Sequence, residues 1–514
     1  MIVADQSETI AFLSRPETFG VGEVRRIDTH ASCVFLAGPK AYKLKRAVLF
    51  PYLDFSTLER RRKFCIAEVA INRRTAPQIY ERVAAITREK SGLALDGAGA
   101  PVDYLVVMNR FDEAGLFDRL SETGALTDEL MLALADEIAG FHDAAERRFD
   151  FGGFPAMVEV IAGNGESLAR HAGAAFEEQA ISELISRSQA AAARNGAVLD
   201  ARKRGGFVRR CHGDLHLRNI CLYEGRPLLF DAIEFSDPIA CIDVLYDLAF
   251  LLMDLEHRGL RRLGNLVFNR YVARGKDGPA QLPGLAALPL FLSCRAAVRA
   301  HVGADAALAQ SHEAAKARLF AESRRYLDLA ARLIAPPPAR LVAIGGLSGT
   351  GKSTLARALA GEIGPAPGEL VLRSDTIRKH LWGAEEFTPL PEEAYAEPMT
   401  KRVYGAIREQ AETALAAGHA VIADAVHARA EERQALQSLA AKLSVPFAGL
   451  WLEASPATLE HRIRDRGRDA SDATVEVLRR QMALPLGEIS WRRIDTAGGF
   501  DAALAGVRDA IGAP

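Results

Sequence analysis

Residues 207–235, FVRRCHGDLHLRNICLYEGRPLLFDAIEF, decide how the first two thirds of this 514-residue chain should fold. The segment predicts an apolar strand, a polar loop HGDLHLRN at 212–219, and a β-hairpin that turns at EGR. The second hairpin strand leads into Asp231, twelve residues after Asn219. Because a hairpin returns the chain to where it began, we expect Asn219 and Asp231 at the same end of a sheet.

The polar loop is compatible with three kinds of site. His212, Asp214 and His216 could be the ligands of a metal hydrolase, but such a site predicts further histidine or carboxylate clusters, and the other histidines are scattered. An ordinary polar turn would have to produce the whole pattern by chance. We favour a phosphoryl-transfer loop: Asp214 accepts the proton of a substrate hydroxyl, Asn219 and Asp231 hold Mg²⁺ on the phosphates, and His212 orients the loop.

With Gly213 where protein kinases have Arg, this loop resembles that of the aminoglycoside phosphotransferase and choline kinase family, a branch of the protein-kinase-like fold. The resemblance should extend over roughly 25–330. It implies an α+β bilobal domain over 1–335, with a small lobe at about 20–111 and a large lobe at about 112–335. It also implies ATP and Mg²⁺ as cofactors.

Upstream residues fit the nucleotide site that this resemblance implies. CVFLAGPKAYKLKRAV, 33–48, predicts a hairpin with Lys43 and Lys45 on one face, and one of the two should hold the α- and β-phosphates. We favour Lys43. The next helix should begin with a capping box, Ser56 to Glu59, and it carries Glu68, the best partner for the lysine.

The adenine site is expected at YLVVMNRF, 104–111, which resembles the hinge strand of the kinase fold and includes Met108. A strict G-x-G-x-x-G loop is missing, since ETFGVGEV supplies only Gly20 and Gly22. The phosphates should therefore be covered less by glycine backbone.

Charged residues after Asp231 could indicate which kind of molecule accepts the phosphoryl group. Four acids could bind a cationic aminoglycoside, but we favour a role in capping and bracing the lobe: Glu234, Asp237, Asp243 and Asp247. Arg295 and Arg299, four apart on a predicted helix, could bind an anionic acceptor, although ion pairs with neighbouring helices are the simpler interpretation.

A proline-rich segment, IAPPPARL at 334–341, predicts a domain boundary at about 336 and a second domain over 336–514. LVAIGGLSGTGKSTLARALA, 341–360, then predicts a strand, a glycine-rich loop and a helix that match G-x-x-x-x-G-K-[ST]. In such a loop, backbone N–H groups and the helix N-terminus bind phosphate, Lys352 reaches the β- and γ-phosphates, and Ser353 binds Mg²⁺. The nucleotide-binding residues are then Gly346, Ser348, Gly349, Thr350, Gly351, Lys352, Ser353 and Thr354.

Five polar residues after the loop complete a candidate second site. Asp375 follows an apolar run and could accept the proton of an attacking hydroxyl, or it could cap the next helix. Arg378, one turn later, could bind an anionic substrate. Asp424 ends a third strand and should support Mg²⁺ through water. Arg462 and Arg466 share a helix face and could cover the phosphoryl group as a lid, or form a solvated basic face.

These motifs resemble the small P-loop kinases of the polynucleotide kinase, gluconate kinase, chloramphenicol phosphotransferase and zeta-toxin group, over about 340–510. The resemblance implies an α/β P-loop NTPase domain with a mainly parallel sheet. It also implies a second use of ATP and Mg²⁺, with a hydroxyl group as acceptor.

Composition indicates which partners and which cellular location the protein should have. Net charge is −2, which makes nucleic acid an improbable partner. Six scattered cysteines form no CxxC pair, which is typical of a reducing compartment. The N-terminus has no signal-peptide pattern, and the most apolar run, 244–253, is too short to span a bilayer. We therefore expect a cytoplasmic protein that does not bind membranes; the oligomeric state is not predicted.

The sequence thus predicts a bifunctional ATP- and Mg²⁺-dependent kinase that phosphorylates hydroxyl groups of small molecules, such as a sugar or a related metabolite. Two alternatives stay open. In one, a single active kinase domain is regulated by nucleotide bound to the other domain. In the other, the C-terminal domain phosphorylates the ends of nucleic acids.

Overall fold

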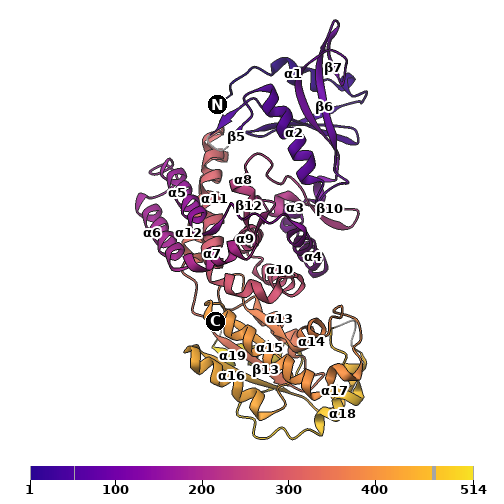
Figure 1. Cartoon of the computed structure of the whole chain (residues 1–514), viewed down its shortest axis with the longest axis vertical. Coiled ribbons are helices and arrows are strands. Elements are labelled where there is room, and N and C mark those ends of the chain that lie inside the picture. The colour runs from indigo at the N-terminus through magenta and orange to yellow at the C-terminus, as the bar shows by residue number, and fades with distance from the viewer. Residues whose placement is uncertain (1, 51–52, 466–469, 513–514) are drawn as a thin grey trace. The chain divides into compact units, whose positions relative to one another are not determined.

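The computed structural model describes residues 2–50, 53–465 and 470–512 (Figure 1). The chain divides into two compact units. The first consists of Met1–Ala156 and Asp200–Leu251, and the second of Met157–Leu199 and Leu252–Pro514. The chain passes from one unit to the other after residues 156, 199 and 251. These three points fall inside helices α5 (Gly153–Ala169), α7 (Gly196–Arg204) and α9 (Val244–His257), respectively.

A six-stranded antiparallel sheet forms the N-terminal part of the first unit, with the order β1-β2-β3-β8-β6-β7. Its strands are β1 (Val24–Asp28), β2 (Ser32–Ala37), β3 (Lys40–Lys45), β6 (Tyr80–Glu89), β7 (Gly92–Leu95) and β8 (Ala100–Asn109). Alternate residues of these strands bury Phe35, Leu44 and Leu105 in one core. The period of two that defines a half-buried strand therefore positions Lys43 and Lys45 on a shared face.

Helix α2 (Leu58–Asn72) packs on this sheet through Cys65 and Val69, which share a core with Val106. Its N-cap is Thr57, whose hydroxyl accepts a hydrogen bond from Arg60 N at 3.3 Å. The predicted capping box, Ser56 to Glu59, is therefore wrong, because the N-cap is Thr57, one residue later. Asp54 holds the Ser56 hydroxyl instead, at 2.6 Å, which leaves Thr57 as the cap.

The rest of the first unit carries the predicted hairpin. Strands β10 and β11 pair antiparallel, with Ile220 opposite Leu229, as the sequence predicts. Strand β9 pairs with β12. The remaining elements are α1 (Ser7–Leu13), η1 (Pro16–Thr18), β4 (Leu49–Phe50), β5 (Leu53–Asp54), η2 (Glu113–Gly115), α3 (Phe117–Glu122), α4 (Asp128–Ala144), β9 (Val208–Arg210), η3 (Leu217–Asn219), β10 (Ile220–Tyr223), β11 (Arg226–Leu229), α8 (Asp237–Ala240) and β12 (Cys241–Asp243).

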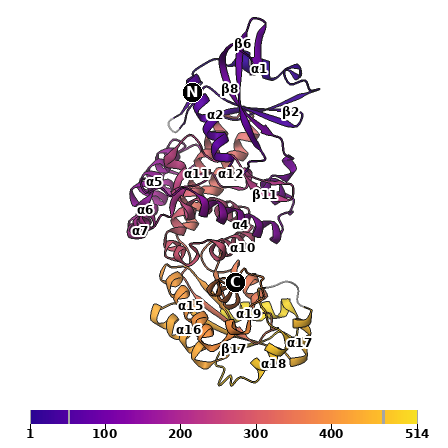
Figure 2. The ribbon, with the colours of Figure 1, turned by 45° about the vertical axis from the view of Figure 1, so that its right-hand side comes forward.

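The second unit contains a five-stranded sheet that is parallel throughout, in the order β14-β15-β13-β16-β17. This confirms the predicted parallel sheet. Its edge strand β17 is labelled in Figure 2. Val342 and Ile344 of β13 face a core that also contains Leu355 and Val507, from the helices on one side. The strands are β13 (Leu341–Gly346), β14 (Leu370–Arg373), β15 (Val421–Asp424), β16 (Phe447–Glu453) and β17 (Arg492–Asp495).

Helices on both sides cover this sheet: α13 and α19 on one, α15 and α16 on the other. The remaining helices of the second unit are α6 (Glu178–Arg194), α10 (Arg261–Arg274), η4 (Gly278–Ala287), α11 (Leu288–Leu308), α12 (Glu313–Leu333), α13 (Lys352–Ala360), α14 (Ser374–Trp382), η5 (Glu392–Tyr395), α15 (Glu397–Ala416), α16 (Ala430–Leu443), α17 (Pro456–Arg464), α18 (Val475–Met482) and α19 (Phe500–Ile511).

Helix α10 covers the edge strand β14. The side-chain amide of Asn269 accepts from Val371 N at 2.7 Å and donates to Glu369 O at 3.0 Å, so it replaces a neighbouring strand. Asn265 donates to the same carbonyl at 3.0 Å. Arg261 donates to three carbonyls that follow α13, those of residues 361, 363 and 364, at 2.9, 3.2 and 2.6 Å. Helix α10 therefore satisfies backbone groups that an isolated sheet edge and helix end leave open.

One described segment, Gly278–Leu308, is long and apolar enough to cross a membrane by length and composition alone. Its most apolar window is 78% buried inside the protein. Such burial is typical of a core helix.

Candidate active sites

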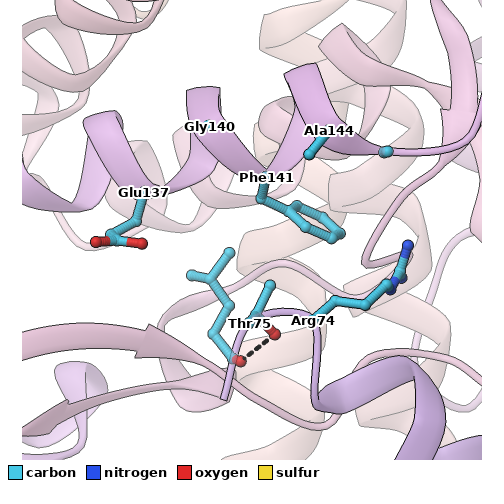
Figure 3. A pocket seen from close by; sticks show the side chains of 8 residues that line it. Arg74, Thr75, Glu137, Gly140, Phe141 and Ala144 are labelled. Atoms are coloured by element: carbon cyan, nitrogen blue, oxygen red, sulfur yellow. Dashed lines mark hydrogen bonds between the residues drawn. The ribbon is translucent and has the colours of Figure 1, made fainter. Parts of the chain in front are cut away.

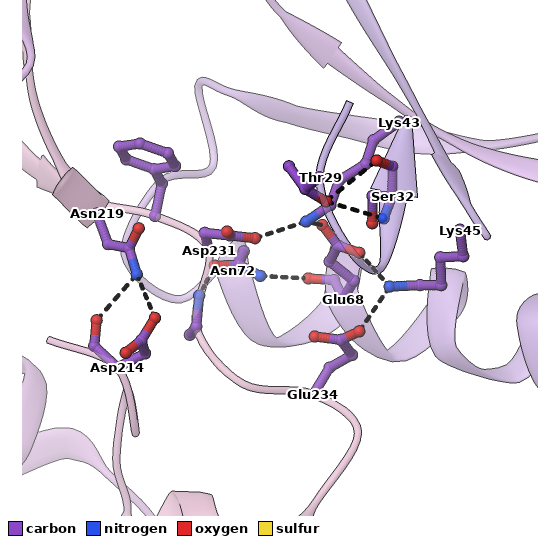
Figure 4. A network of polar contacts seen from close by, with 12 residues as sticks. Thr29, Ser32, Lys43, Lys45, Glu68, Asn72, Asp214, Asn219, Asp231 and Glu234 are labelled. Carbon is purple, nitrogen blue, oxygen red and sulfur yellow. Dashed lines mark hydrogen bonds and ion pairs between the residues drawn. The ribbon is translucent and has the colours of Figure 1, made fainter. Parts of the chain in front are cut away.

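Lys43 lies at the centre of an ion-pair network in the first unit (Figure 4). Its Nζ is 2.8 Å from Glu68 Oε1 and 2.6 Å from Asp231 Oδ1. Strand β3, helix α2 and the segment after β11 each supply one of these residues. Burial lowers the pKa of Lys43, but the carboxylates of Asp231 and Glu68 outweigh it and hold that pKa well above its usual value. Lys43 is therefore a fixed cation beside the predicted metal carboxylate.

Lys45, two residues along β3, lies between Glu68 Oε2 and Glu234 Oε1, each at 2.5 Å. Its side chain is 1% exposed, against 15% for Lys43. Burial raises the pKa of Glu68, but the two ammonium groups outweigh it and lower that pKa to about 2. The geometry favours Lys43 as the phosphate-binding lysine, because Lys45 is enclosed by two carboxylates and contacts neither Asp214 nor Asp231 in the ion pairs of the described residues.

The predicted catalytic loop is ordered around Asp214. The Asn219 amide nitrogen donates to Asp214 O and Asp214 Oδ2, both at 2.9 Å (Figure 4). With its nitrogen used in this way, the amide oxygen is the group that Asn219 can offer to a metal. His216 Nε2 lies 3.4 Å from Asp214 Oδ2, and its ring packs nearly perpendicular to the Phe250 ring, with the ring centroids 5.2 Å apart. In the phosphoryl-transfer interpretation His216 had no predicted role, and its position two residues after Asp214 is the signal in the sequence that could have indicated one.

His212 holds the loop together and does not face a substrate. It is fully buried, its Nε2 lies 2.9 Å from Phe230 O, and its Nδ1 accepts from Asp214 N at 3.3 Å. Burial lowers its pKa, which favours the neutral ring that these two contacts require. His212 thus joins the backbone of Asp214 to the residue before Asp231, as expected for an orienting role.

Asp231 has a left-handed backbone, with φ of 62°, although it is not glycine. Its N–H donates to the Tyr80 hydroxyl at 3.1 Å. Strained backbone at a non-glycine residue is typical of functional sites. Asn219 and Asp231 supply the oxygen donors that Mg²⁺ prefers, so the residues present fit the metal that the fold implies.

The four acids around the loop are occupied in the way the bracing interpretation predicts. Asp247 accepts from the backbone N–H groups of His212 and Gly213 at 3.1 and 2.8 Å. The other three form ion pairs: Glu234 with Lys45, Asp237 with Arg210, and Asp243 with Arg202.

Within the described residues, one group of histidine, cysteine and acid side chains has its donor atoms within 4.8 Å of one another: His142, Cys211 and Asp247. It is not the set of the metal-hydrolase alternative. The Cys211 thiol donates to Ile242 O at 3.4 Å, and the Asp247 oxygens already accept from two backbone N–H groups. These contacts indicate that the group stabilises the fold.

A pocket of about 320 Å³ lies elsewhere in the first unit (Figure 3). The Arg74 guanidinium in it donates to Arg210 O at 2.9 Å, and Thr75 donates to Leu229 O at 2.7 Å. It contains none of the predicted site residues. Its lining consists of Arg74, Thr75, Glu137, Gly140, Phe141, Ala144, Ala145 and Leu229.

The phosphate loop of the second unit has the predicted form. Helix α13 begins at Lys352, and Gly351 before it has a left-handed backbone, with φ of 87°. Gly349 also has positive φ, 86°, and a Cβ there would lie 2.8 Å from Leu459 O. The loop therefore needs glycine both for its turn and for its close approach to α17. Lys352 Nζ donates to Leu347 O at 3.0 Å.

Asp424 ends β15 beside this loop. Burial raises its pKa, while Arg373, Lys352 and a hydrogen bond from the Ser353 hydroxyl act in the opposite direction. Among the described residues, Asp424 Oδ2 is buried without a hydrogen-bond partner. A buried carboxylate oxygen that lacks a donor, with a serine hydroxyl beside it, fits the Mg²⁺ that the P-loop implies.

Arg373, which the sequence did not single out, lies between the two predicted acids. Its Nε is 3.9 Å from Asp424 Oδ2, and its Nη2 is 3.7 Å from Asp375 Oδ2. Asp375 is in the first turn of α14 and does not cap it, because the N-cap position is Arg373 and no side chain accepts a capping hydrogen bond there. The capping interpretation of Asp375 is therefore wrong. Arg373 could be recognised only from structure, because arginine in a β-strand has no distinctive pattern.

The predicted arginines are held by protein groups. Arg378 donates to Ala394 O at 2.8 Å and lies over the Tyr395 ring. Arg462 donates to the hydroxyl and carbonyl of Thr496 at 3.0 and 2.7 Å. Arg466 lies outside the described residues. The substrate and lid roles of these arginines stay predictions.

Two remaining nucleotide-site predictions concern Met108 and Thr354. Met108 is on β8, opposite Ala41 and Tyr80, and packs against the core below α2. Thr354 is in the first turn of α13. Both lie on the elements expected for them.

Two family models match the chain: one described as phosphotransferase enzyme family, over residues 58–285, and one described as AAA domain, over residues 341–484. Uncharacterized proteins of Mycobacterium tuberculosis and Mycobacterium bovis are each 30% identical over 482 residues, which covers 92% of this chain and 92% of each relative.

Two solved kinases match parts of the chain. A gluconokinase from Sinorhizobium meliloti 1021 is 25% identical and covers 34% of this chain and 94% of its own, with a TM-score of 0.24. The Plasmodium vivax ethanolamine kinase is 11% identical and covers 60% of this chain and 82% of its own, with a TM-score of 0.38. The chain belongs to the family of these mycobacterial proteins, and in this chain a kinase-like domain of the phosphotransferase enzyme family precedes a P-loop kinase domain.

Proposed function

We propose that the chain is a bifunctional ATP- and Mg²⁺-dependent kinase of the cytoplasm. Each kinase-like domain transfers the γ-phosphoryl group of ATP to a hydroxyl of a small molecule, such as a sugar or a related metabolite. The observation that carries the proposal is the convergence of Lys43, Glu68 and Asp231 with a complete Asp214–Asn219 loop, in a chain that also has an intact phosphate loop. A net charge of −2 supports a small acceptor over nucleic acid.

At the first site, Asp214 accepts the proton of the acceptor hydroxyl as the oxygen attacks phosphorus. Asn219 and His216 fix the direction of its carboxylate through the contacts at 2.9 and 3.4 Å. Lys43, held by Glu68, binds the α- and β-phosphates. Mg²⁺ bound at Asn219 and Asp231 would neutralise the phosphate oxygens.

At the second site, the N–H groups at the start of α13 and the Lys352 ammonium hold the phosphates. Asp375 accepts the acceptor proton, and Arg373, which pairs with both the Asp375 and Asp424 carboxylates, reduces the repulsion between them. Mg²⁺ bound by Ser353 and Asp424 would supply the same charge neutralisation as at the first site.

A screen of metabolites for ATP-dependent mass gain of 80 Da, with the intact chain, tests this proposal. The screen should include sugars, amino alcohols and aminoglycosides. We expect phosphorylated products that disappear in Asp214→Asn or in Lys352→Ala. Products that survive in both variants would exclude these two sites as their source.

One observation favours the alternative in which one nucleotide site regulates the other. Arg261 and Asn269 of α10, which lies within the residues that match the phosphotransferase model, contact the end of α13 and the edge strand β14. Nucleotide bound at the N-terminus of α13 could therefore change the position of α10. If Lys352→Ala alters the rate at the first site without abolishing any product, the regulatory alternative is the better account.

A further inference from the structure

The phosphate loop is contacted by a glutamine that no motif identifies. Ser348, the second residue after Gly346, donates its backbone N–H to Gln481 Oε1 at 2.9 Å. Ser348 is buried, with 7% of its surface exposed. Backbone N–H groups of this loop are the groups that bind phosphate oxygens in P-loop proteins. Gln481 therefore places a side-chain oxygen on a group that the nucleotide would use.

Helix α18, which carries Gln481, is fixed on the loop by several contacts. Leu478 is fully buried in a core with Leu459 and Ile463 of α17, and Leu347 of the phosphate loop packs against that core. Arg479 binds Glu460 of α17 at 3.1 Å. Because residues three apart share a helix face, burial of Leu478 directs Gln481 toward the loop.

Lys352 and Gln481 act on the same peptide group. Lys352 Nζ binds the carbonyl oxygen of Leu347 at 3.0 Å, and Gln481 binds the N–H of Ser348, which belongs to that same peptide. Lysine at this position reaches the β- and γ-phosphates in P-loop kinases. The peptide between these two side chains therefore lies beside the lysine that would reach the terminal phosphates.

A carboxamide can interact with such a loop both when the loop is empty and when it binds a phosphate. Its oxygen accepts from Ser348 N–H, but a phosphate oxygen is charged and is the stronger acceptor for the same N–H. Rotation of the amide by half a turn then presents two N–H donors to the phosphate. Glutamate would repel the anion, and methionine has a similar shape without a donor.

We propose that Gln481 is a positioning residue for the phosphoryl group that the second site transfers. Its carbonyl oxygen holds Ser348 N–H when the loop is empty, and its amide nitrogen donates to an oxygen of the γ-phosphate when ATP is bound. This inference rests on the proposed function of the P-loop domain. It adds a residue that distinguishes ATP from ADP.

The test compares Gln481→Met and Gln481→Glu in the intact chain, on a Lys43→Met background that removes the lysine of the first site. Calorimetry measures Kd for ADP and for an ATP analogue with a non-hydrolysable β–γ bridge, both with Mg²⁺. We expect Gln481→Met to weaken the analogue by about tenfold and ADP by less than about twofold, which corresponds to one charge-assisted hydrogen bond to the γ-phosphate. Gln481→Glu should weaken the analogue further.

Gln434→Met, an exposed glutamine on α16, is the matched control and should leave both affinities unchanged. Equal weakening of ADP and analogue in Gln481→Met would show a structural role only, and unchanged affinities would show no role; either result overturns the inference. If Lys352→Ala on the same background leaves nucleotide binding unchanged, the P-loop is not a nucleotide site. The proposed function of that domain then fails together with the inference.

Discussion

The ammonium group of Lys43 lies 2.6 Å from Asp231 Oδ1, although 188 positions separate the two residues in the chain. Strand β3 and the hairpin β10–β11 therefore meet at one point, where a phosphate-binding lysine and a metal-binding carboxylate would be needed together. The same strand also carries Lys45, and the two lysines should have separable functions.

Lys43→Met should lower kcat/KM of the first site by about 100-fold or more, because it removes a fixed cation from the phosphates while leaving Lys45 to pair with Glu68. Lys45→Met should instead reduce the free energy of unfolding by about 3 kcal/mol, since it leaves Glu234 buried without its lysine. Steady-state kinetics and urea unfolding of both variants separate these effects. A catalytic loss confined to Lys45→Met would reverse the assignment.

Asp214→Asn should lower kcat of the first site by 10²- to 10⁴-fold, about the usual contribution of a general base, with little change in the affinity for ATP. His216→Phe keeps the ring packing on Phe250 but removes the contact to Asp214, so we expect a smaller loss of about tenfold. Initial rates at saturating ATP measure both. Equal losses in the two variants would mean that His216 does more than orient the carboxylate.

Asp424→Asn should weaken the binding of Mg²⁺ at the second site. The substitution keeps the size of the side chain but removes the negative charge that the buried oxygen offers to a cation. We expect the Mg²⁺ concentration for half-maximal rate to rise by about tenfold or more. An unchanged Mg²⁺ titration would exclude Asp424 as a metal-supporting residue.

A fragment that begins at residue 336 should be less stable than the same residues in the intact chain. The cut removes Asn265 and Asn269 from the edge of β14 and Arg261 from the carbonyls after α13. Each lost hydrogen bond costs about 1 kcal/mol, and an exposed strand edge favours aggregation.

Thermal unfolding and light scattering of the fragment test this expectation, and a fragment that begins at residue 252 provides the control because it retains α10. Equal melting temperatures for the two fragments would show that α10 contributes nothing to the P-loop domain.

Stability of the second unit should fall in acid. Burial lowers the pKa of His427 to about 3, and the neighbouring charges of Lys352 and Arg433 act in the same direction. The folded state therefore binds fewer protons than the unfolded state between about pH 3 and pH 6.5. The free energy of unfolding must then decrease as pH falls through this window, by at most about 1.4 kcal/mol per pH unit for one proton.

His427→Phe should reduce this slope without removing it, because burial also lowers the pKa of His301 and His419 to about 4. Urea unfolding at several pH values between 4 and 7 gives the slope. The same slope in wild type and His427→Phe would contradict the buried, neutral state of this histidine.

Sequence patterns predicted the residues that are close together in the chain or that belong to a fixed motif. The hairpin β10–β11, the loop around Asp214 and the glycine-rich loop before α13 all appear at the predicted positions. These features depend on local geometry, such as the left-handed backbone that Gly351 supplies.

Residues that come from distant segments could not be predicted in the same way. Arg373, Gln481 and the asparagines of α10 act through contacts that depend on how helices and strands pack, and their types are common at ordinary positions. The sequence favours Lys43 over Lys45, but the pairing of Lys45 with Glu234, 189 residues away, is a reason that only the structure supplies. Periodicity places a side chain on a face but does not identify its partner.

The most direct test of two active kinase sites is the rate of phosphoryl transfer by the intact chain in wild type, Asp214→Asn, Lys352→Ala and the double variant, with the acceptors that the metabolite screen identifies. We predict that each single variant loses the transfer to one acceptor and retains the other, and that the double variant loses both. Full retention of both transfers in either single variant would contradict the account.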